Sequence, residues 1–298
     1  MITGSTKGVG LALAEAFLEA GDKVAICSRS EEKVKSKVEE LQSRFGEDRV
    51  FGQVCNVAKA GQVKDFASFA KAELGQIDVW INNAGSNGYQ FTPLMESDTE
   101  KLQEIVETNT LGLMFCLKEA MDVMKSQVGV TGHIFNMDGA GTSGSATPRF
   151  AAYGATKRAI TQLNKSLQAE LSMLGITNIV LHMLSPGMVT TELLMSGSDT
   201  KIAKFMINAL AEEPREVATF LVPRVREVVL ASSEGKDGVS ASGTGSGDDA
   251  ATASFKAFLD KFNTGGSSYI KYLTLPKAFL QIFLKGVLGI RNNRWVQE

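Results

Sequence analysis

The stretch TGSTKGVG, residues 3–10, decides the expected fold. It follows the apolar pair Met1-Ile2 and precedes a helical pattern over residues 8–20. Glycines at a strand-to-helix turn let the backbone approach a pyrophosphate, and the helix N-terminus offers N–H groups and positive potential. We therefore predict a dinucleotide-binding turn made of Gly4, Ser5, Thr6, Lys7, Gly8, Val9 and Gly10. Because the chain begins inside this first strand, we expect upstream residues to be missing.

Strand and helix patterns alternate after this turn. Expected strands cover residues 23–27, 49–55, 77–81, 133–137 and 178–184, and expected helices cover residues 31–44, 60–74, 99–125 and 150–174. Strands joined by such helices form right-handed βαβ units. The prediction is an α/β fold, a Rossmann-like doubly wound parallel sheet with helices on both faces. Its ligand crevice lies at the carboxyl ends of the strands.

The composition divides the chain into three parts. Residues 1–231 form the expected dinucleotide-binding and catalytic domain, and the Gly/Ser/Asp-rich residues 232–254 form a flexible insertion. Residues 255–298 form an apolar and basic C-terminal extension in which no final strand is recognised. From residue 269 onward, five basic residues and one acidic residue alternate with Phe279, Leu280, Ile282, Phe283, Leu284 and Trp295. This extension fits a membrane interface, or packing on the domain or on a partner subunit.

Charge and cysteine usage exclude several classes of protein. The net charge of −2 over 298 residues gives no global basic footprint, so we expect no nucleic-acid partner. Cys27, Cys55 and Cys116 are odd in number and far apart, which favours buried thiols in a reducing compartment. His133 and His182 fall in expected strands and are interpreted as core residues. Without a Cys/His cluster, no metal site is predicted.

The second strand-to-helix junction indicates which cofactor is bound. An NAD site usually has an acidic residue here for the ribose hydroxyls, but this junction reads Ser28-Arg29. The planar guanidinium of Arg29 suits a 2′-phosphate, and Lys7 is a second phosphate partner. We therefore predict NADPH/NADP⁺. After the fourth strand, Asn83, Ala84 and Gly85 are expected to admit the cofactor ribose.

Tyr153 and Lys157 lie four residues apart and so share one face of a helix. A free phenol, with a pKa of about 10, is a slow acid or base at neutral pH. A neighbouring ammonium and an oxidised nicotinamide would lower that pKa. The phenol would then exchange a proton with a carbonyl or alcohol oxygen while hydride moves at carbon. We predict this pair to be catalytic.

Four ordered motifs, TGSTKGVG, NNAG, YGATK and SPGMVTTEL, resemble the short-chain dehydrogenase/reductase family over about residues 1–230. The resemblance implies that Tyr153 and Lys157 are catalytic and also contact the cofactor. It adds Asn109 to the proton relay. The remaining cofactor contacts that it implies are Asn56, Val57, Pro186, Gly187, Val189 and Thr191.

The expected catalytic serine is absent. The family places it thirteen residues before the tyrosine, where this chain has Ala140. The loop MDGAGTSGS, residues 137–145, supplies Ser143 as our predicted catalytic hydroxyl; Ser145, or no hydroxyl, are the alternatives.

A narrower resemblance rests on HIFNMDGAG, TPRFAAYGATK and LSPGMVTTELLMSG. These runs are similar to the chlorophyll b reductases of plants and green algae, in their shorter, non-yellow coloring 1-like branch. The resemblance implies NADPH-dependent reduction of the 7-formyl group of chlorophyll b or chlorophyllide b to a hydroxymethyl group, the first step of chlorophyll b degradation. It also implies a chloroplast location on the stromal side of the thylakoid membrane. A homo-oligomer, or a complex with a related reductase, is expected.

A pigment of this size needs a wide apolar cleft. One of its walls is predicted to be Leu193, Leu194, Met195, Phe205 and Met206, for which simple helix core is the alternative. Two other functions fit the same residues. One is reduction of another bulky apolar carbonyl, such as a steroid, retinoid or acyl group. The other is an NADP-binding scaffold with weak catalysis.

Overall fold

The computed structural model describes residues 1–196, 199–234, 267–291 and 293–297. Its strands are β1 (Val24–Ser28), β2 (Val50–Val54), β3 (Val79–Asn82), β4 (Gly132–Met137), β5 (Ile179–Ser185) and β6 (Tyr269–Lys271). Its helices are α1 (Gly8–Glu19), α2 (Glu31–Phe45), α3 (Ala60–Leu74), η1 (Leu94–Glu96), α4 (Thr99–Val106), η2 (Glu107–Leu111), α5 (Gly112–Lys125), α6 (Ala151–Met173), α7 (Glu192–Met195), α8 (Lys201–Leu210), α9 (Pro214–Glu234) and α11 (Leu275–Leu288).

All strand pairs are parallel. β1 pairs with β2, and β3, β4, β5 and β6 follow one another in a second run. Ile2 joins the two runs, because it forms parallel bridges with both Ile26 and Ile81. The segment that contains Ile2 therefore lies between β1 and β3. Strand order reverses there, and in open α/β sheets this is where ligands bind.

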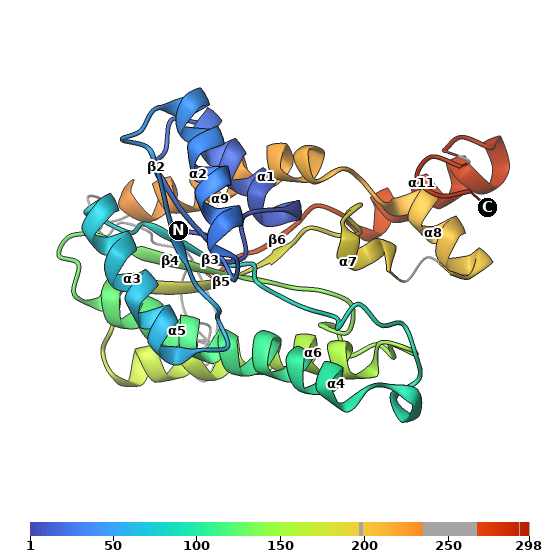
Figure 1. Ribbon diagram of the computed structural model, residues 1–298, viewed down its shortest axis with the longest axis horizontal. Helices are drawn as coiled ribbons and strands as arrows, with labels where there is room; N and C mark the ends of the chain where they lie inside the picture. Colours follow the sequence, from blue (N-terminus) through green and yellow to red (C-terminus); the bar gives the residue numbers. More distant parts are fainter. Residues whose placement is uncertain (197–198, 235–266, 292, 298) are drawn as a thin grey trace, which may run out of the picture.

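Helices cover both faces of the sheet, which confirms the predicted doubly wound architecture. In Figure 1, α1, α2 and α9 lie above the sheet, and α3, α5 and α6 lie below it. Leu13 and Phe17, one helical turn apart on α1, pack in the same core as Leu221 of α9. On the other face, Phe66 packs in a core with Leu117. Burial of each such side chain contributes about 1.5–3 kcal/mol.

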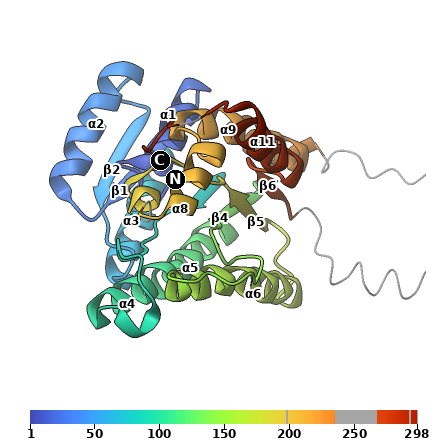
Figure 2. The ribbon, with the colours of Figure 1, turned by 90° about the vertical axis from the view of Figure 1, so that its right-hand side faces the viewer.

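The predicted helix over residues 99–125 forms without a break, but its hydrogen-bond pattern changes in the middle. Between α4 and α5 the chain forms the π-helical segment η2, and Asn109 lies within it. Such π segments cost stability and occur often at functional sites, where they redirect a side chain. Figure 2 shows α4, α5 and α6 at the same side of the molecule.

The C-terminal part differs from its prediction, because it does contain a final strand. Residues 269–271 form β6, which pairs with β5 over residues 183–185. The strand has three residues and only Ile270 is buried, so its sequence pattern is too short to be recognised. Helix α9 also continues to Glu234, three residues into the predicted insertion. The rest of that insertion lies outside the described residues.

The core residues agree with their predicted roles. Cys27, Cys55 and Cys116 are free and buried. His133 and His182 are fully buried, with their Nδ1 and Nε2 atoms 3.0 Å apart, and His182 Nδ1 accepts the backbone N–H of Ser268. Burial and the neighbouring His133 lower the pKa of His182 to about 3. His182 is therefore neutral at neutral pH, and both histidines are buried core residues, as the sequence indicates.

Candidate active site

A cleft of about 1000 Å³ opens at the carboxyl ends of the strands. Most of the predicted site residues line it: Gly4, Thr6, Lys7, Gly8, Val9, Ser28, Arg29, Asn56, Val57, Asn83, Ala84, Gly85, Tyr153, Lys157, Pro186, Gly187, Val189 and Thr191. Four predicted residues are not among its lining, namely Ser5, Gly10, Asn109 and Ser143. The fold thus brings together segments that are up to 187 residues apart in the sequence.

The glycine turn has no room for larger residues. A Cβ on Gly10 would lie 2.5 Å from the carbonyl oxygen of Gly4 and 2.4 Å from Asn83 Nδ2. Gly4 itself has a φ of +63°, in the left-handed region that favours glycine. Ser5 supports the turn from beneath, because its hydroxyl donates to Ile2 O and accepts from Cys27 N. Ser5 and Gly10 therefore shape the cofactor turn without lining the cleft.

Tyr153 and Lys157 face the cleft from the first turns of α6. Lys157 is 6% exposed, and its Nζ donates to Met137 O at 3.0 Å and lies 5.6 Å from the centre of the Tyr153 ring. Burial lowers the pKa of Lys157 to about 8, although Asp138 opposes that change. Burial, together with the nearby Asp138, raises the pKa of Tyr153 well above its ordinary value. The phenol is therefore protonated at neutral pH, but Lys157 does not lower its pKa as the sequence analysis expects.

Asn109 connects the two sides of the catalytic region. Its Nδ2 donates to Ser86 O and Thr156 Oγ1, and its Oδ1 accepts from Ser86 N. A Cβ on Gly85 would lie 3.5 Å from Asn109 Oδ1 and 3.9 Å from Lys157 Nζ, so both side chains approach the same point. Asn109 therefore holds the Gly85 segment beside Lys157, from behind the cleft surface.

The structure does not bring Ser143 into the cleft. Ser143 and Ser145 are exposed, and their hydroxyls hydrogen-bond to each other at 2.9 Å. The reason is that the loop after β4 packs directly on α6. A Cβ on Gly139 would lie only 2.4 Å from the Tyr153 hydroxyl, and one on Gly141 would lie 2.6 Å from Gly154 Cα. Our prediction of Ser143 as the catalytic hydroxyl is therefore not supported, nor is the alternative Ser145.

Two polar residues other than the predicted serines lie near Tyr153: Asp138 directly after β4, and Ser185 at the end of β5. Both line the cleft, and Asp138 accepts a hydrogen bond from the hydroxyl of Tyr269 on β6. Burial raises the pKa of Asp138, while Tyr269 and Ser185 oppose that rise by hydrogen bonding. None of these three residues is predicted from the sequence. Asp138 could have been recognised as a site residue, because it stands directly after an expected strand in the motif MDGAG. Tyr269 could not, because its strand has no recognisable pattern.

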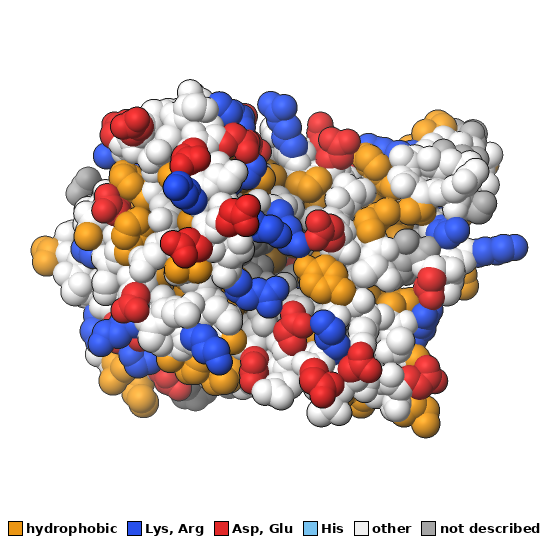
Figure 3. Space-filling view, viewed as in Figure 1, with side chains coloured by type: hydrophobic (Ala, Val, Ile, Leu, Met, Phe, Trp, Pro, Cys, Tyr) orange, Lys and Arg blue, Asp and Glu red, His pale blue; other side chains and the backbone are white. Residues whose placement is uncertain are grey.

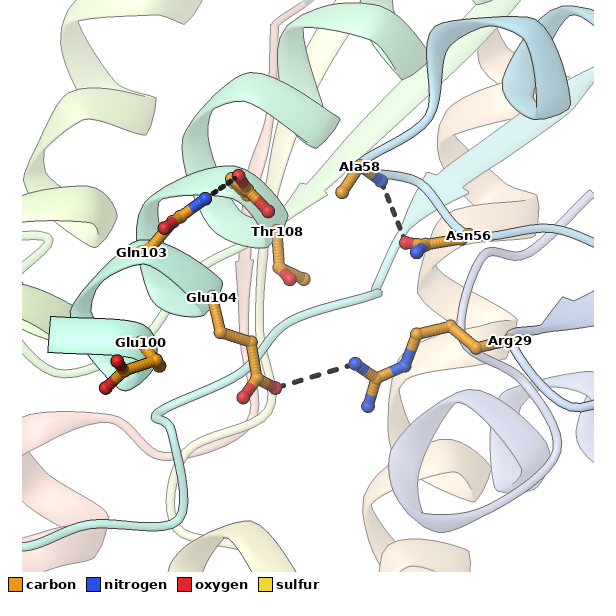
Figure 4. Close-up of a pocket in the computed structure, with 8 residues that line it drawn as sticks. Arg29, Asn56, Ala58, Glu100, Gln103, Glu104 and Thr108 are labelled. Carbon is orange, nitrogen blue, oxygen red and sulfur yellow. Dashed lines mark hydrogen bonds and ion pairs between the residues drawn. The ribbon is translucent and has the colours of Figure 1, made fainter. Parts of the chain in front are cut away.

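The predicted phosphate-binding residues also line the cleft. Arg29 follows β1, and Asn56 lies in the turn after β2, where its Oδ1 accepts from Ala58 N (Figure 4). Lys7 donates to Glu192 and lies 3.4 Å from the Tyr89 hydroxyl. The hydrogen bond to Glu192 raises the pKa of Lys7, although burial opposes it. Both predicted cations therefore lie at the cleft.

The predicted apolar wall is partly correct. Leu193 and Leu194 line the cleft, as do Ala203 and Ile207 of α8, whereas Met195, Phe205 and Met206 do not. Aromatic rings form another part of the wall. Phe91 and Phe150 have ring centres 4.4 Å apart, and both line the cleft.

Comparison with known proteins agrees with this geometry. The short chain dehydrogenase family model matches residues 1–202. Over 298 residues the chain is 49% identical to the "Chlorophyll(ide) b reductase NOL, chloroplastic" of Oryza sativa subsp. japonica and covers 78% of it. It is 50% identical to the protein of the same name from Arabidopsis thaliana, of which it covers 76%. Both alignments span all of this chain.

A solved structure shares the fold. The alcohol dehydrogenase of the archaeon Thermococcus sibiricus, complexed with 5-hydroxy-NADP, superposes with a TM-score of 0.63 at 26% identity. The match covers 76% of this chain and 89% of that protein. Together with the cleft, its glycine turn and the Tyr153–Lys157 pair, these matches show that the chain belongs to the short-chain dehydrogenase family, in the group that contains the two chlorophyll(ide) b reductases.

Proposed function

We propose that this protein reduces the 7-formyl group of chlorophyll b, or of chlorophyllide b, to a hydroxymethyl group at the expense of NADPH. One observation carries the proposal. A protonated Tyr153, paired with Lys157, faces a cleft of about 1000 Å³ with an apolar wall. The identity of about half of all positions with curated chlorophyll(ide) b reductases supports a chlorophyll substrate.

The cleft residues fit a 2′-phosphorylated dinucleotide. At Gly10 there is no room for a side chain, so the backbone of the glycine turn is compact. A pyrophosphate would lie against this turn, beside the N-terminus of α1. Arg29 and Lys7 provide positive charge for the 2′-phosphate, and no acidic residue ends β1. Pro186, Gly187, Val189 and Thr191 would hold the carboxamide end. When bound, the reduced nicotinamide supplies the hydride that adds to the formyl carbon.

The protein's own residues manage the proton. Tyr153 donates its hydroxyl proton to the carbonyl oxygen as that oxygen becomes an alkoxide. Lys157, positioned by Met137 O, then stabilises the phenolate that remains. Burial, and after it the nearby Asp138, raise the pKa of the phenol, so Tyr153 holds its proton until the carbonyl oxygen gains negative charge. Asn109 keeps the Gly85 segment beside Lys157.

An absorbance assay tests the proposal. Purified protein is mixed with NADPH and chlorophyll b or chlorophyllide b, and the spectral change from formyl to hydroxymethyl pigment is followed with NADPH consumption. We expect one NADPH to be oxidised for each formyl group reduced. Turnover of a small ketone without turnover of pigment would point to another carbonyl substrate. NADPH binding without any turnover would point to a scaffold.

We further propose that α11 holds the protein against the membrane that contains the pigment, on the stromal side of the thylakoid in the chloroplast. Residues Leu275, Phe279, Phe283 and Val287 recur every four positions, and each is at least 55% exposed. Figure 3 shows apolar side chains at the end of the molecule formed by α8 and α11. Since α11 packs on α8, and α8 lines the cleft, this face would bring the cleft to the lipid surface.

Three basic residues of this extension do not join that face. Arg291 and Arg294 both pair with the buried Glu212, at 2.9 Å each, and Lys285 is 3% exposed. Packing on the domain, one of the three readings that the sequence leaves open, therefore applies to these charged residues. No helix in the described parts of the chain is long and apolar enough to cross a membrane. We propose peripheral contact through α11, because its 14 residues are fewer than the about 20 that a membrane span needs.

Replacement of both Phe279 and Phe283 by Asp should weaken vesicle binding by more than about tenfold, because each buried Phe contributes about 1.5–3 kcal/mol. Co-sedimentation with phosphatidylcholine vesicles, with and without phosphatidylglycerol, measures this. The control is a double Asp variant at Met173 and Leu174, which are exposed at the end of α6. Equal loss in both variants, or none in either, would contradict a specific role for α11.

A homo-oligomer is the other partner that we propose. Val106, Leu111 and Met114 are each more than 40% exposed along the continuous α4–η2–α5 helix, where a second copy could cover them. Light scattering should give a mass of at least two chains, and a monomer at working concentration would exclude this proposal.

A further inference from the structure

A second cavity, of about 250 Å³, adjoins the phosphate-binding end of the cleft (Figure 4). Arg29, Asn56 and Ala58 line one side of it. The facing side is formed by Glu100, Gln103 and Glu104 of α4 with Glu107 and Thr108 of η2. The cavity thus separates one guanidinium from a mostly acidic helix. Arg29, Asn56 and Thr108 also line the main cleft, so the two spaces adjoin.

One of these acidic groups reaches Arg29. The Arg29 Nη1 atom lies 3.5 Å from Glu104 Oε1, across the cavity. Glu104 is itself anchored, because Ser86 Oγ donates to Oε1 at 3.0 Å and Lys101 Nζ lies 3.4 Å from Oε2. Burial alone would raise the pKa of Glu104, but the Ser86 hydrogen bond and the charges of Lys101 and Arg29 lower it below its ordinary value. Glu104 is therefore a fixed anion at neutral pH.

We propose that Glu104 competes with the 2′-phosphate of NADP(H) for Arg29, and so sets the affinity and selectivity of the site for phosphorylated cofactor. The inference rests on the proposed cofactor. In the free protein the Glu104 carboxylate holds the guanidinium that the 2′-phosphate needs. Binding of that phosphate requires Arg29 to exchange one anion for another, with Glu104 close by.

Two physical effects oppose the phosphate. First, the ion pair between Arg29 and Glu104 must be broken or shared. Second, the Glu104 carboxylate repels the 2′-phosphate, which carries the same sign of charge and would lie close to it. Lys7 shows the same arrangement, because Glu192 holds its ammonium. Each cation predicted to bind the 2′-phosphate is therefore already paired with a carboxylate. Such an arrangement weakens NADP⁺ retention after hydride transfer and so speeds cofactor exchange.

The test compares E104Q with the unchanged protein. The glutamine would keep the size of the side chain and can still accept from Ser86, so folding is preserved; thermal melting verifies this. Calorimetry measures binding of NADPH, NADH, adenosine 2′,5′-bisphosphate and adenosine 5′-monophosphate. We expect E104Q to bind NADPH and the bisphosphate about tenfold more tightly, about 1.4 kcal/mol. NADH and the monophosphate should change by less than about twofold. The gain should shrink at about 1 M salt, where screening is short-ranged.

The matched control is E100Q. Glu100 lines the same cavity on the same helix but is not paired with Arg29, and the variant loses the same formal charge. An equal gain in E100Q would mean a general charge effect and overturn the proposal. An unchanged or weaker affinity of E104Q for the bisphosphate would also overturn it, since Glu104 would then orient Arg29 rather than compete for it. Absence of NADPH binding in the unchanged protein would instead refute the proposed function.

Discussion

Replacement of Tyr153 by Phe should lower kcat for pigment reduction by about 10³-fold while leaving NADPH affinity nearly unchanged. The side chain keeps its ring, its contact with Phe150 and its place over Gly139, so only the proton donor is lost. Among the groups beside it, Lys157 donates to Met137 O and Asp138 accepts from Tyr269. Neither is placed to protonate the alkoxide as Tyr153 is.

Steady-state kinetics with chlorophyllide b and calorimetry with NADPH separate the two effects. Tyr272→Phe is the matched control, because Tyr272 is a buried core residue that packs on Phe220 outside the cleft. It should retain its activity. If Tyr153→Phe stayed within about tenfold of the unchanged protein, another group would have to supply the proton, and Asp138 would be the first candidate.

The parts of the site that the sequence predicts correctly are local. The glycine turn and the Tyr153–Lys157 pair depend on spacings of a few residues within one turn or one helix, and the structure keeps both. The position of Arg29 in the cleft also follows from the sequence, because the end of a strand fixes it. Its partner Glu104 is not predicted, since only the packing of α4 across the cleft brings the two side chains together.

The same distinction explains the missed strand. β6 contains one buried residue and pairs with β5, 86 residues earlier, so no local pattern marks it. Yet β6 delivers Tyr269 to Asp138, close to Tyr153. The family motifs contain many of the residues that line the part of the cleft expected to bind the cofactor. The C-terminal extension, which the resemblance did not describe, supplies polar contacts to the reactive end.

The prediction of Ser143 rests on the serines of the loop at residues 137–145, because the family's position holds Ala140. The second large effect concerns that loop. The family's spacing of thirteen residues leads to Ala140, but the residue against the Tyr153 hydroxyl is Gly139. Gly139→Ser would therefore place a serine closest to the position where the family's hydroxyl acts. This substitution should not improve the enzyme. We expect it to lower kcat by about 10²-fold, because misplacement of a reacting group by about 1 Å has an effect of that size.

The geometry gives the reason. A Cβ at position 139 would lie 2.4 Å from the Tyr153 hydroxyl and 3.1 Å from Lys157 Cε, so it would displace both catalytic side chains. Ala140→Ser adds the same hydroxyl at the neighbouring, exposed position and Ser143→Ala removes the exposed hydroxyl; both should keep most of the activity. Kinetics on all three variants, with melting curves to verify folding, decide the matter. A gain in kcat for Gly139→Ser would show that Tyr153 can move aside and that the site lacks a hydroxyl; a loss would show that Gly139 is required for the position of Tyr153.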